Sequence, residues 1–357
     1  MNTPPREIDV RDAVVDRLPD LLPNLEIGKI QLDWRTPVGQ RADLTVETRS
    51  GSKRRLLIIE VKSNGEPRHA LAAVAELRRM IRGTGDAYPV FCAPFVPAST
   101  RTLLKEDGVG YLDLSGNAYL RFGAVLVDRS SPEPPPKRRP GTRELLTPKT
   151  TRILRALLDN PNKTFGVREL AALCRLSPAA VVSASRLLED KAFVERDAER
   201  RVVLTRPGPL LDFWAGAWAF DRNAVARYFS VNSAPRDIMD DISRLAAREN
   251  LPYGLTLQAG ASLVAPFVRF ADVWFYAPGD LQPWIEGLDL APATAGANVM
   301  LVSPYDGGVL DGVRLIKKKA VVSDVQLYVD LYNFPARGRE QAEFLRDRRI
   351  PFGRPKT

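Results

Sequence analysis

Residues 147–206 constrain the fold more than any other part of the chain. A hydroxyl residue stands directly before a proline at 147–148 and again at 177–178. Such pairs are typical helix starts, because the hydroxyl caps the first turn and proline suits its first position. Apolar residues at helical spacing follow both pairs. The expected elements are helices over 148–158, 167–174 and 177–191 and two strands on either side of Ala198-Glu199.

Three helices followed by a hairpin is the element order of a winged helix-turn-helix domain, whose third helix enters the major groove. The residues Val181, Ala184 and Leu188 form the inward stripe of that third helix. This leaves four candidate residues for the groove-facing side, Ala179, Ala180, Ser183 and Arg186. A generic helical hairpin followed by a β-ribbon is the alternative interpretation.

Four arginines decorate the expected wing, Arg196, Arg200, Arg201 and Arg206. Guanidinium groups at these positions suit phosphates or the minor groove. The alternative for each of them is a solvated basic surface.

The charge of the chain supports a polyanionic partner. The 357 residues carry a formal net charge of +9, and residues 132–206 hold 16 Lys and Arg against 9 Asp and Glu. The middle of the chain therefore supplies +7 of the excess. We expect double-stranded DNA as the partner, and no cofactor is needed to bind it.

Composition divides the chain into blocks. Ser130–Arg143 contains five prolines and four basic residues, which favour extended chain over packed structure. We expect an α+β multidomain protein. The expected parts are an α/β domain at 1–131, a proline-rich basic linker at 132–143, a winged helix-turn-helix domain at 144–209 and an α/β domain at 210–357.

The first block contains two strand-like runs, RADLTVETR and RRLLIIEVK, separated by SGSK. If Gly51-Ser52 forms a two-residue turn, Asp43 lies opposite Glu60. Lys62 is two residues further along and shares the face of Glu60. Two carboxylates and an ammonium group in one place suit metal-assisted cleavage of phosphodiesters.

The pattern of Asp43 followed by Glu60-Val61-Lys62 resembles the PD-(D/E)XK nuclease-like superfamily. The resemblance implies an α/β nuclease-like fold, with Asp43 and Glu60 as ligands of Mg²⁺ or Mn²⁺ and Lys62 as the catalytic cation. A hairpin with a solvated charged end is the alternative, and the fold is also reused for binding without catalysis.

Cysteine and histidine exclude several other chemistries. Cys92 and Cys174 lie far apart in apolar stretches, and His69 is the only histidine. A disulfide scaffold, a cysteine zinc site and a multi-histidine metal site are therefore not expected. No run approaches the roughly 18 apolar residues of a membrane span, and the N-terminus is unlike a signal peptide. We expect a cytoplasmic protein without membrane contact.

The last block is rich in apolar and aromatic runs. Its sequence favours strands over 297–306 and 319–334 and a final amphipathic helix within 322–347. The Gly260-Ala261-Ser262 string favours tight packing over a phosphate cradle.

The segments GYLDLSGNAYL and VSDVQLYVDLYNF, together with the winged helix, resemble the AbiEi family of type IV toxin-antitoxin antitoxins. The resemblance is strongest at 108–122 and 323–346. It implies a transcriptional repressor that binds inverted repeats, and a C-terminal domain that opposes a nucleotidyltransferase-like toxin. In the simplest family pattern the winged helix comes first, whereas here about 130 residues precede it.

These observations favour a DNA-binding transcriptional regulator of antitoxin type, and symmetric sites would imply a homodimer. The first alternative is a Mg²⁺-dependent DNA endonuclease targeted by the winged helix. A further alternative is a protein-interaction module in phage defence, with the aromatic C-terminal block as its contact surface.

Overall fold

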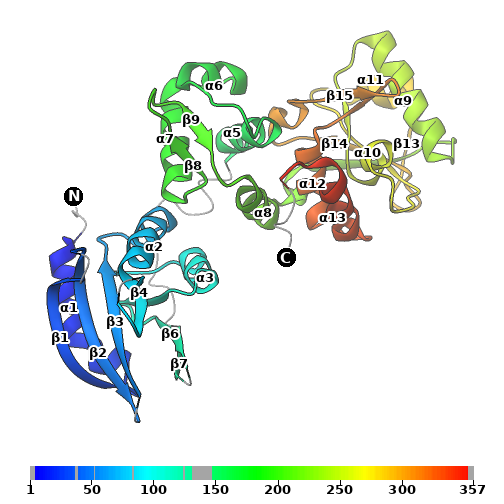
Figure 1. Ribbon diagram of the computed structural model, residues 1–357. Coiled ribbons are helices and arrows are strands. Elements are labelled where there is room, and N and C mark those ends of the chain that lie inside the picture. The colour runs from blue at the N-terminus through cyan, green and yellow to red at the C-terminus, as the bar shows by residue number, and fades with distance from the viewer. Residues whose placement is uncertain are drawn as a thin grey trace. The chain divides into compact units, whose positions relative to one another are not determined.

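The computed structural model describes residues 5–36, 39–51, 53–82, 84–123, 125–130 and 147–352. Helices and mixed sheets alternate along the chain, which confirms the expected α+β class (Figure 1). The chain divides into two compact units, Met1–Arg139 with Asp190–Ala192 and Pro140–Glu189 with Phe193–Thr357. The linker expected at 132–143 lies outside the described residues.

A seven-stranded sheet organises the first unit, with its strands in sequential order. The central pairs β3–β4 and β4–β5 are parallel, and the outer pairs are antiparallel. The strands are β1 (Glu26–Arg35), β2 (Arg41–Ser50), β3 (Lys53–Val61), β4 (Ala87–Ala93), β5 (Gly110–Asp113), β6 (Ala118–Phe122) and β7 (Val125–Arg129).

Helices cover both faces of this sheet. The apolar side of α1 (Glu7–Leu21) packs on one face, and α2 (Pro67–Ile81) and α3 (Ala98–Glu106) pack on the other. Two separate apolar clusters result, one on each side of the sheet. A chain that buries apolar residues on both faces of parallel central strands produces this three-layer arrangement.

The LDLSGN segment between β5 and β6 is a structural turn. The carboxylate of Asp113 accepts hydrogen bonds from the backbone nitrogens of Val96, Ser115 and Asn117. Gly116 adopts φ +97, a conformation that suits glycine. This turn closes the β5–β6 hairpin and fixes the loop that precedes α3.

The second unit begins with the three helices and the hairpin that the sequence predicts. The Thr147 hydroxyl accepts a hydrogen bond from the backbone nitrogen of Thr150, as expected for a helix cap. We call residues 147–206 the three-helix module. Its elements are α5 (Pro148–Asp159), α6 (Val167–Cys174), α7 (Pro178–Asp190), β8 (Val194–Arg196) and β9 (Val202–Leu204).

A second seven-stranded sheet follows, in the order β13-β10-β14-β12-β11-β16-β15 with parallel and antiparallel pairs. Its strands are β10 (Ala224–Phe229), β11 (Gly254–Leu255), β12 (Val273–Tyr276), β13 (Ala291–Pro292), β14 (Val299–Ser303), β15 (Arg314–Ile316) and β16 (Lys319–Val321). The helices and short 3₁₀ turns of this part are α8 (Pro207–Ala217), η1 (Phe220–Arg222), α9 (Pro235–Glu249), α10 (Leu257–Val264), α11 (Gln282–Gly287), η2 (Gly307–Leu310), α12 (Asp324–Tyr332) and α13 (Gly338–Arg349).

Two sequence expectations for this part have different outcomes. The strand expected over 319–334 is wrong beyond residue 321, because residues 324–332 form helix α12. Tight packing at Gly260 is confirmed, since a Cβ there would lie 2.7 Å from both the Leu255 carbonyl oxygen and a Leu327 methyl group.

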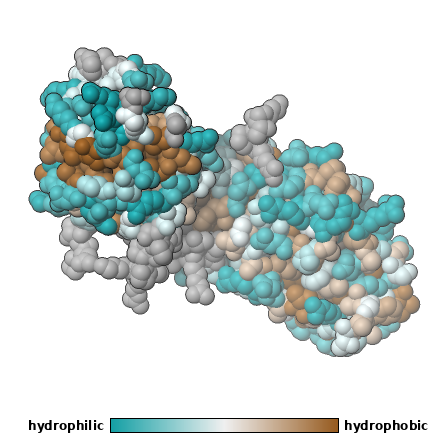
Figure 2. All heavy atoms as spheres, turned by 90° about the horizontal axis from the view of Figure 1, so that it is seen from below, coloured by the Kyte–Doolittle hydropathy of each residue, from teal (hydrophilic) through white to brown (hydrophobic). Residues whose placement is uncertain are grey.

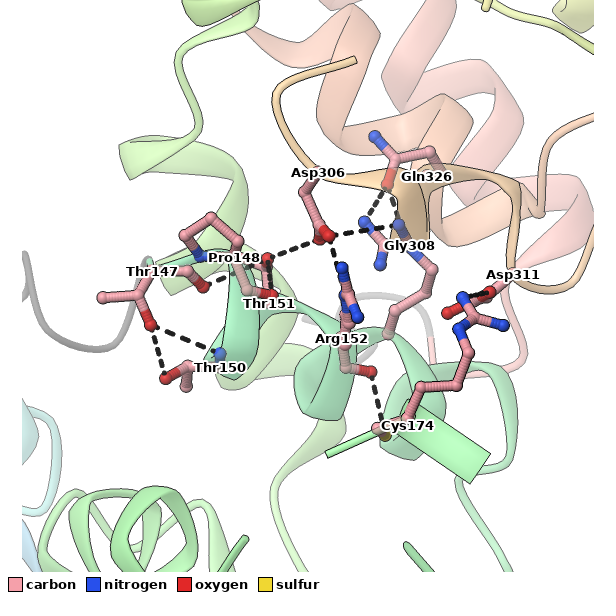
Figure 3. A network of polar contacts seen from close by, with 12 residues as sticks. Thr147, Pro148, Thr150, Thr151, Arg152, Cys174, Asp306, Gly308, Asp311 and Gln326 are labelled. Atoms are coloured by element: carbon pink, nitrogen blue, oxygen red, sulfur yellow. Dashed lines mark hydrogen bonds and ion pairs between the residues drawn. The ribbon is translucent and has the colours of Figure 1, made fainter. Parts of the chain in front are cut away.

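The three-helix module and the C-terminal sheet share one apolar cluster, which runs from Ile153 to Ile350. Polar contacts also join them (Figure 3). Arg155, which is almost fully buried on α5, donates to Gln326 Oε1 at 2.6 and 3.0 Å. Arg152 donates to Asp306 Oδ1 at 2.7 Å. Residues 144–209 and 210–357 therefore fold as one unit.

The surface of the first unit has apolar and hydrophilic areas. Figure 2 shows a band of apolar residues on its visible face, between hydrophilic margins. Among the described residues of the first unit, the exposed large apolar side chains are Ile8, Leu32 and Leu126. In the described part of the chain, no single helix has the length and apolarity to cross a membrane; only α6 and α7 taken together reach them, with a 106° bend between.

Candidate functional site

Asp43 and Glu60 lie on neighbouring strands of the first unit, β2 and β3, in the register that the hairpin predicts. Leu44 pairs with Ile59 and Ser50 pairs with Lys53, which is the register expected from a turn at 51–52. One step beyond Leu44 and Ile59, this register places Asp43 opposite Glu60. The Asp43 carboxylate bridges the same strands, because its Oδ2 accepts a hydrogen bond of 2.8 Å from the Val61 backbone nitrogen.

Glu60 lies in an unusual environment for a carboxyl group. Its side chain is 7% exposed, and Oε2 has no hydrogen-bond partner. Burial raises the pKa of Glu60 to about 8, and the negative charge of Asp43 acts in the same direction, while the hydrogen bond from Lys62 opposes the shift. Glu60 therefore binds a proton readily, and a cation could take the place of that proton.

Lys62 follows the end of β3 and completes the group of charges. Its Nζ donates to Glu60 Oε1 at 2.6 Å and to Glu76 Oε2 at 3.4 Å. Burial lowers the pKa of Lys62, but the surrounding carboxylates outweigh that effect and hold the pKa above its ordinary value. The expected grouping of Asp43, Glu60 and Lys62 is thus present in the structure.

Two acidic residues of this group escaped the sequence analysis. Glu76 on α2 contacts Lys62, and Glu7 on α1 raises the pKa of Lys62 through its charge. Burial raises the pKa of Glu76, but the neighbouring Glu60 and the charge of Lys62 lower it below its usual value. A signal for Glu76 existed, because it lies between the buried Ala73 and Met80 on the sheet-facing side of α2.

Asp43 and Glu60 offer two carboxylate ligands to a divalent cation. In the described ranges, no group of three or more His, Cys, Asp or Glu residues could hold a metal ion. Mg²⁺ is often bound by one or two carboxylates, with water completing its shell. Asp43 and Glu60 fit such a site because Glu60 Oε2 is free to accept a cation.

The cysteines do not add a reactive site. Both thiols are buried and unpaired, as expected. Burial raises the pKa of Cys174 to about 11 and raises that of Cys92 further. Neither thiol carries much thiolate near neutral pH.

On the three-helix module, α7 presents the expected side to solvent. Ala179, Ser183 and Arg186 are exposed, and Ala180 is half-buried. The opposite side of α7 packs inward through Val181, Ala184 and Leu188, as the sequence predicts. Helix α7 leaves α6 after a three-residue turn at a 106° bend, within the range of helix-turn-helix motifs.

The four wing arginines differ in their contacts. Arg196 pairs with Glu189 at 2.5 Å, and Arg201 pairs with Asp197 at 2.8 Å and Glu199 at 3.0 Å. Arg206 is half-buried just before α8. Arg200 is exposed at φ +62 in the turn, and its guanidinium forms no ion pair with any described residue.

The structure therefore contains two candidate sites, the charged group at Asp43 and the exposed side of α7 with the wing. The chain matches no protein-family model, no curated protein and no solved structure.

Proposed function

We propose that this protein is a transcriptional regulator that binds double-stranded DNA through the three-helix module, used as a winged helix-turn-helix domain. The geometry of α6 and α7 supports the proposal most directly. A 106° bend over a three-residue turn presents α7 as a helix that fits the major groove.

The surface of the module supports the same use. The short exposed side chains Ala179 and Ser183 allow the helix to approach base edges closely. Arg186 on α7 and Arg200 on the wing are exposed and form no ion pair with the described residues. Both guanidinium groups are therefore available to DNA without first losing a carboxylate partner.

Binding of a labelled duplex library, followed by fluorescence anisotropy over a salt series, tests this proposal. Replacing Arg186 and Arg200 together with alanine should weaken binding roughly tenfold and lower the salt slope by about 0.9 for each lost phosphate contact. Arg201→Ala should have a smaller effect, because Asp197 and Glu199 already hold that guanidinium.

Arg248→Ala is the matched control, because this arginine is exposed on α9 and is paired with the neighbouring Glu249. It should leave both the affinity and the salt slope unchanged. Duplex affinity that is unaffected in the Arg186 and Arg200 double variant would refute binding through this module.

We propose that the regulator acts as an AbiEi-type antitoxin, functionally linked to a nucleotidyltransferase-like toxin, and that it binds inverted repeats as a homodimer in the cytoplasm. The support is the resemblance of residues 108–122 and 323–346 to that family. Co-expression with a nucleotidyltransferase-like toxin of a type IV system tests the role. An antitoxin restores growth, whereas continued growth arrest argues against it.

A metal-dependent DNA nuclease is the second candidate function. It is favoured by Glu60, a buried carboxyl group with a free oxygen opposite Asp43 and in contact with Lys62. In this role Asp43 and Glu60 hold Mg²⁺ or Mn²⁺, which supplies Lewis-acid chemistry, and Lys62 orients groups at the phosphodiester.

Incubation of supercoiled DNA with the purified protein and Mg²⁺ or Mn²⁺ tests this activity. Cleavage by the wild type that is lost in both Asp43→Ala and Lys62→Ala would establish the nuclease. Glu106→Ala, an exposed carboxylate on α3, is the control and should behave like the wild type. If the DNA stayed intact with the wild type and with every variant, the nuclease activity would be refuted and DNA binding would remain as the proposed function.

A further inference from the structure

A groove lies on the first unit, at the turn end of the β2–β3 hairpin. The hairpin, the start of β1 and the loop between α2 and β4 enclose a groove of about 910 Å³. Residues 49 and 54 line it, six positions along the strands from Asp43 and Glu60. At strand spacing that is about 20 Å, so the groove is distinct from the charged group at Glu60.

Two arginines face each other in this groove. Arg49 pairs directly with Arg54 in the ladder, and Lys53 follows opposite Ser50. Directly opposed side chains have Cβ atoms about 4.5–5.5 Å apart, and like charges at that distance repel. Glu26 compensates Arg49 through an ion pair of 2.8 Å. Arg54 forms no ion pair with a described residue, so its positive charge is available to an anion.

One glycine stands on each side of the groove. Gly28 lies in the irregular stretch of β1 where the register shifts between Ile27 and Ile30. Gly85 stands on the facing loop at φ +27, with open space where a Cβ would be. Backbone without side chains lets a ligand approach closely, and bulges of this kind are frequent beside binding sites.

We infer that this groove binds phosphoryl groups. A guanidinium matches two phosphate oxygens at once, and Arg54 supplies such a group without a carboxylate partner, directly opposite Arg49, which is paired with Glu26. The volume lies in the range of small-molecule sites, and Ile27 and Leu56 provide apolar wall. The phosphates belong either to a nucleotide-sized ligand or to a nucleic-acid backbone. The inference does not depend on DNA binding by the three-helix module.

Replacing Glu47 should change phosphate affinity in the opposite direction to replacing Arg54. It also lines the groove, on the face of Arg49 and diagonal to Arg54, without an ion pair to either. Its negative charge opposes a bound phosphate. Removing that charge therefore strengthens phosphate binding, whereas removing Arg54 weakens it.

Calorimetric titration of the full chain with inorganic pyrophosphate, without added metal, tests the inference. Arg54→Ala should bind roughly tenfold more weakly than the wild type, because a charge-assisted contact is lost. Glu47→Gln should bind more tightly, which a misfolded variant could not do. Arg78→Ala, an exposed arginine of α2 paired with Asp107, should bind like the wild type. Undetectable binding by the wild type, or equal affinity in Arg54→Ala, would overturn the inference.

Competition identifies the source of the phosphate. ATP and a short duplex are each added to the pyrophosphate complex, with Arg186 and Arg200 replaced by alanine so that the module contributes little. Displacement by ATP alone assigns a nucleotide, and displacement by duplex alone assigns the backbone. Displacement by neither would contradict a phosphoryl site of either kind.

Discussion

At the scale of single residues, Glu60 combines burial with competing charges. Its carboxyl group is opposite Asp43, contacts Lys62 and keeps one oxygen without a partner. The hairpin turn predicted this pairing, because a two-residue turn fixes the register of both strands. Glu76 was not predicted, since the apolar side of α2 shows that residue 76 faces the sheet but does not show which strand residue it contacts.

The pKa of Glu60 leads to a pH-dependent stability. Its value of about 8 in the folded protein exceeds the ordinary 4.5, so folding takes up a proton between these values. This contribution stabilises the first unit fully below pH 4.5 and is lost as the pH rises to about 8. Glu60→Gln keeps a neutral group at all pH values, so its stability should gain on the wild type as the pH increases.

Differential scanning calorimetry of both proteins from pH 5 to pH 8.5 measures this effect. The melting temperature of the first unit in Glu60→Gln should rise relative to the wild type as the pH increases to about 8 and then level off, because all other titrating groups are common to both. Parallel pH profiles would show that Glu60 ionises normally.

Gly308 marks a close approach between two parts of the second unit. A Cβ at this position would lie 2.6 Å from Arg152 Cγ and 2.9 Å from Arg155 Nη1. Gly308→Ala should therefore reduce the free energy of unfolding by about 1–3 kcal/mol. The neighbouring Gly307→Ala is the control, since a Cβ there meets nothing within 4 Å. Denaturant unfolding compares them, and equal losses would contradict a specific clash.

At the scale of elements, α12 shows where sequence patterns are ambiguous. Seven of its nine residues are buried, so neither a period of two nor a period of 3.6 is readable in its apolar run. The structure places Ser323 at the cap position of α12, where its hydroxyl accepts a hydrogen bond from the Gln326 backbone nitrogen at 3.2 Å. The three-helix module was predicted more accurately, since its helices have one clear apolar side and two Xaa-Pro starts.

The capping hydrogen bond of Ser323 predicts how substitutions at this residue affect stability. Ser323→Ala should lower the free energy of unfolding of the second unit by about 1 kcal/mol, because the first turn of α12 loses its hydroxyl acceptor. Ser323→Thr keeps that acceptor and should retain most of the stability. Chemical denaturation of both variants measures the difference. A loss in the threonine variant equal to that in the alanine variant would point to packing at residue 323 instead.

At the scale of the whole molecule, composition predicts separate domains at 144–209 and 210–357, whereas the structure packs them into one unit. The sequence placed a boundary near 206–209, where the chain becomes aromatic. In the structure, Pro207 opens α8, whose buried Trp214 belongs to the apolar cluster shared by the three-helix module and the C-terminal sheet. Arg155 contacts Trp214 through its guanidinium and Gln326 through hydrogen bonds. The hydrogen-bond partner of Arg155 lies 171 residues away, so the role of this arginine cannot be assigned from local pattern.

The shared cluster predicts how fragments behave. Residues 1–131 contain both apolar clusters of the first unit and should fold alone, and 140–357 should fold as one cooperative body. Residues 144–209 alone should be far less stable, because their apolar cluster is cut and the buried Arg155 becomes exposed. Circular dichroism melts of the three fragments measure this order. If 144–209 alone melted as cooperatively and at the same temperature as 140–357, the C-terminal sheet would be dispensable for the fold of the three-helix module.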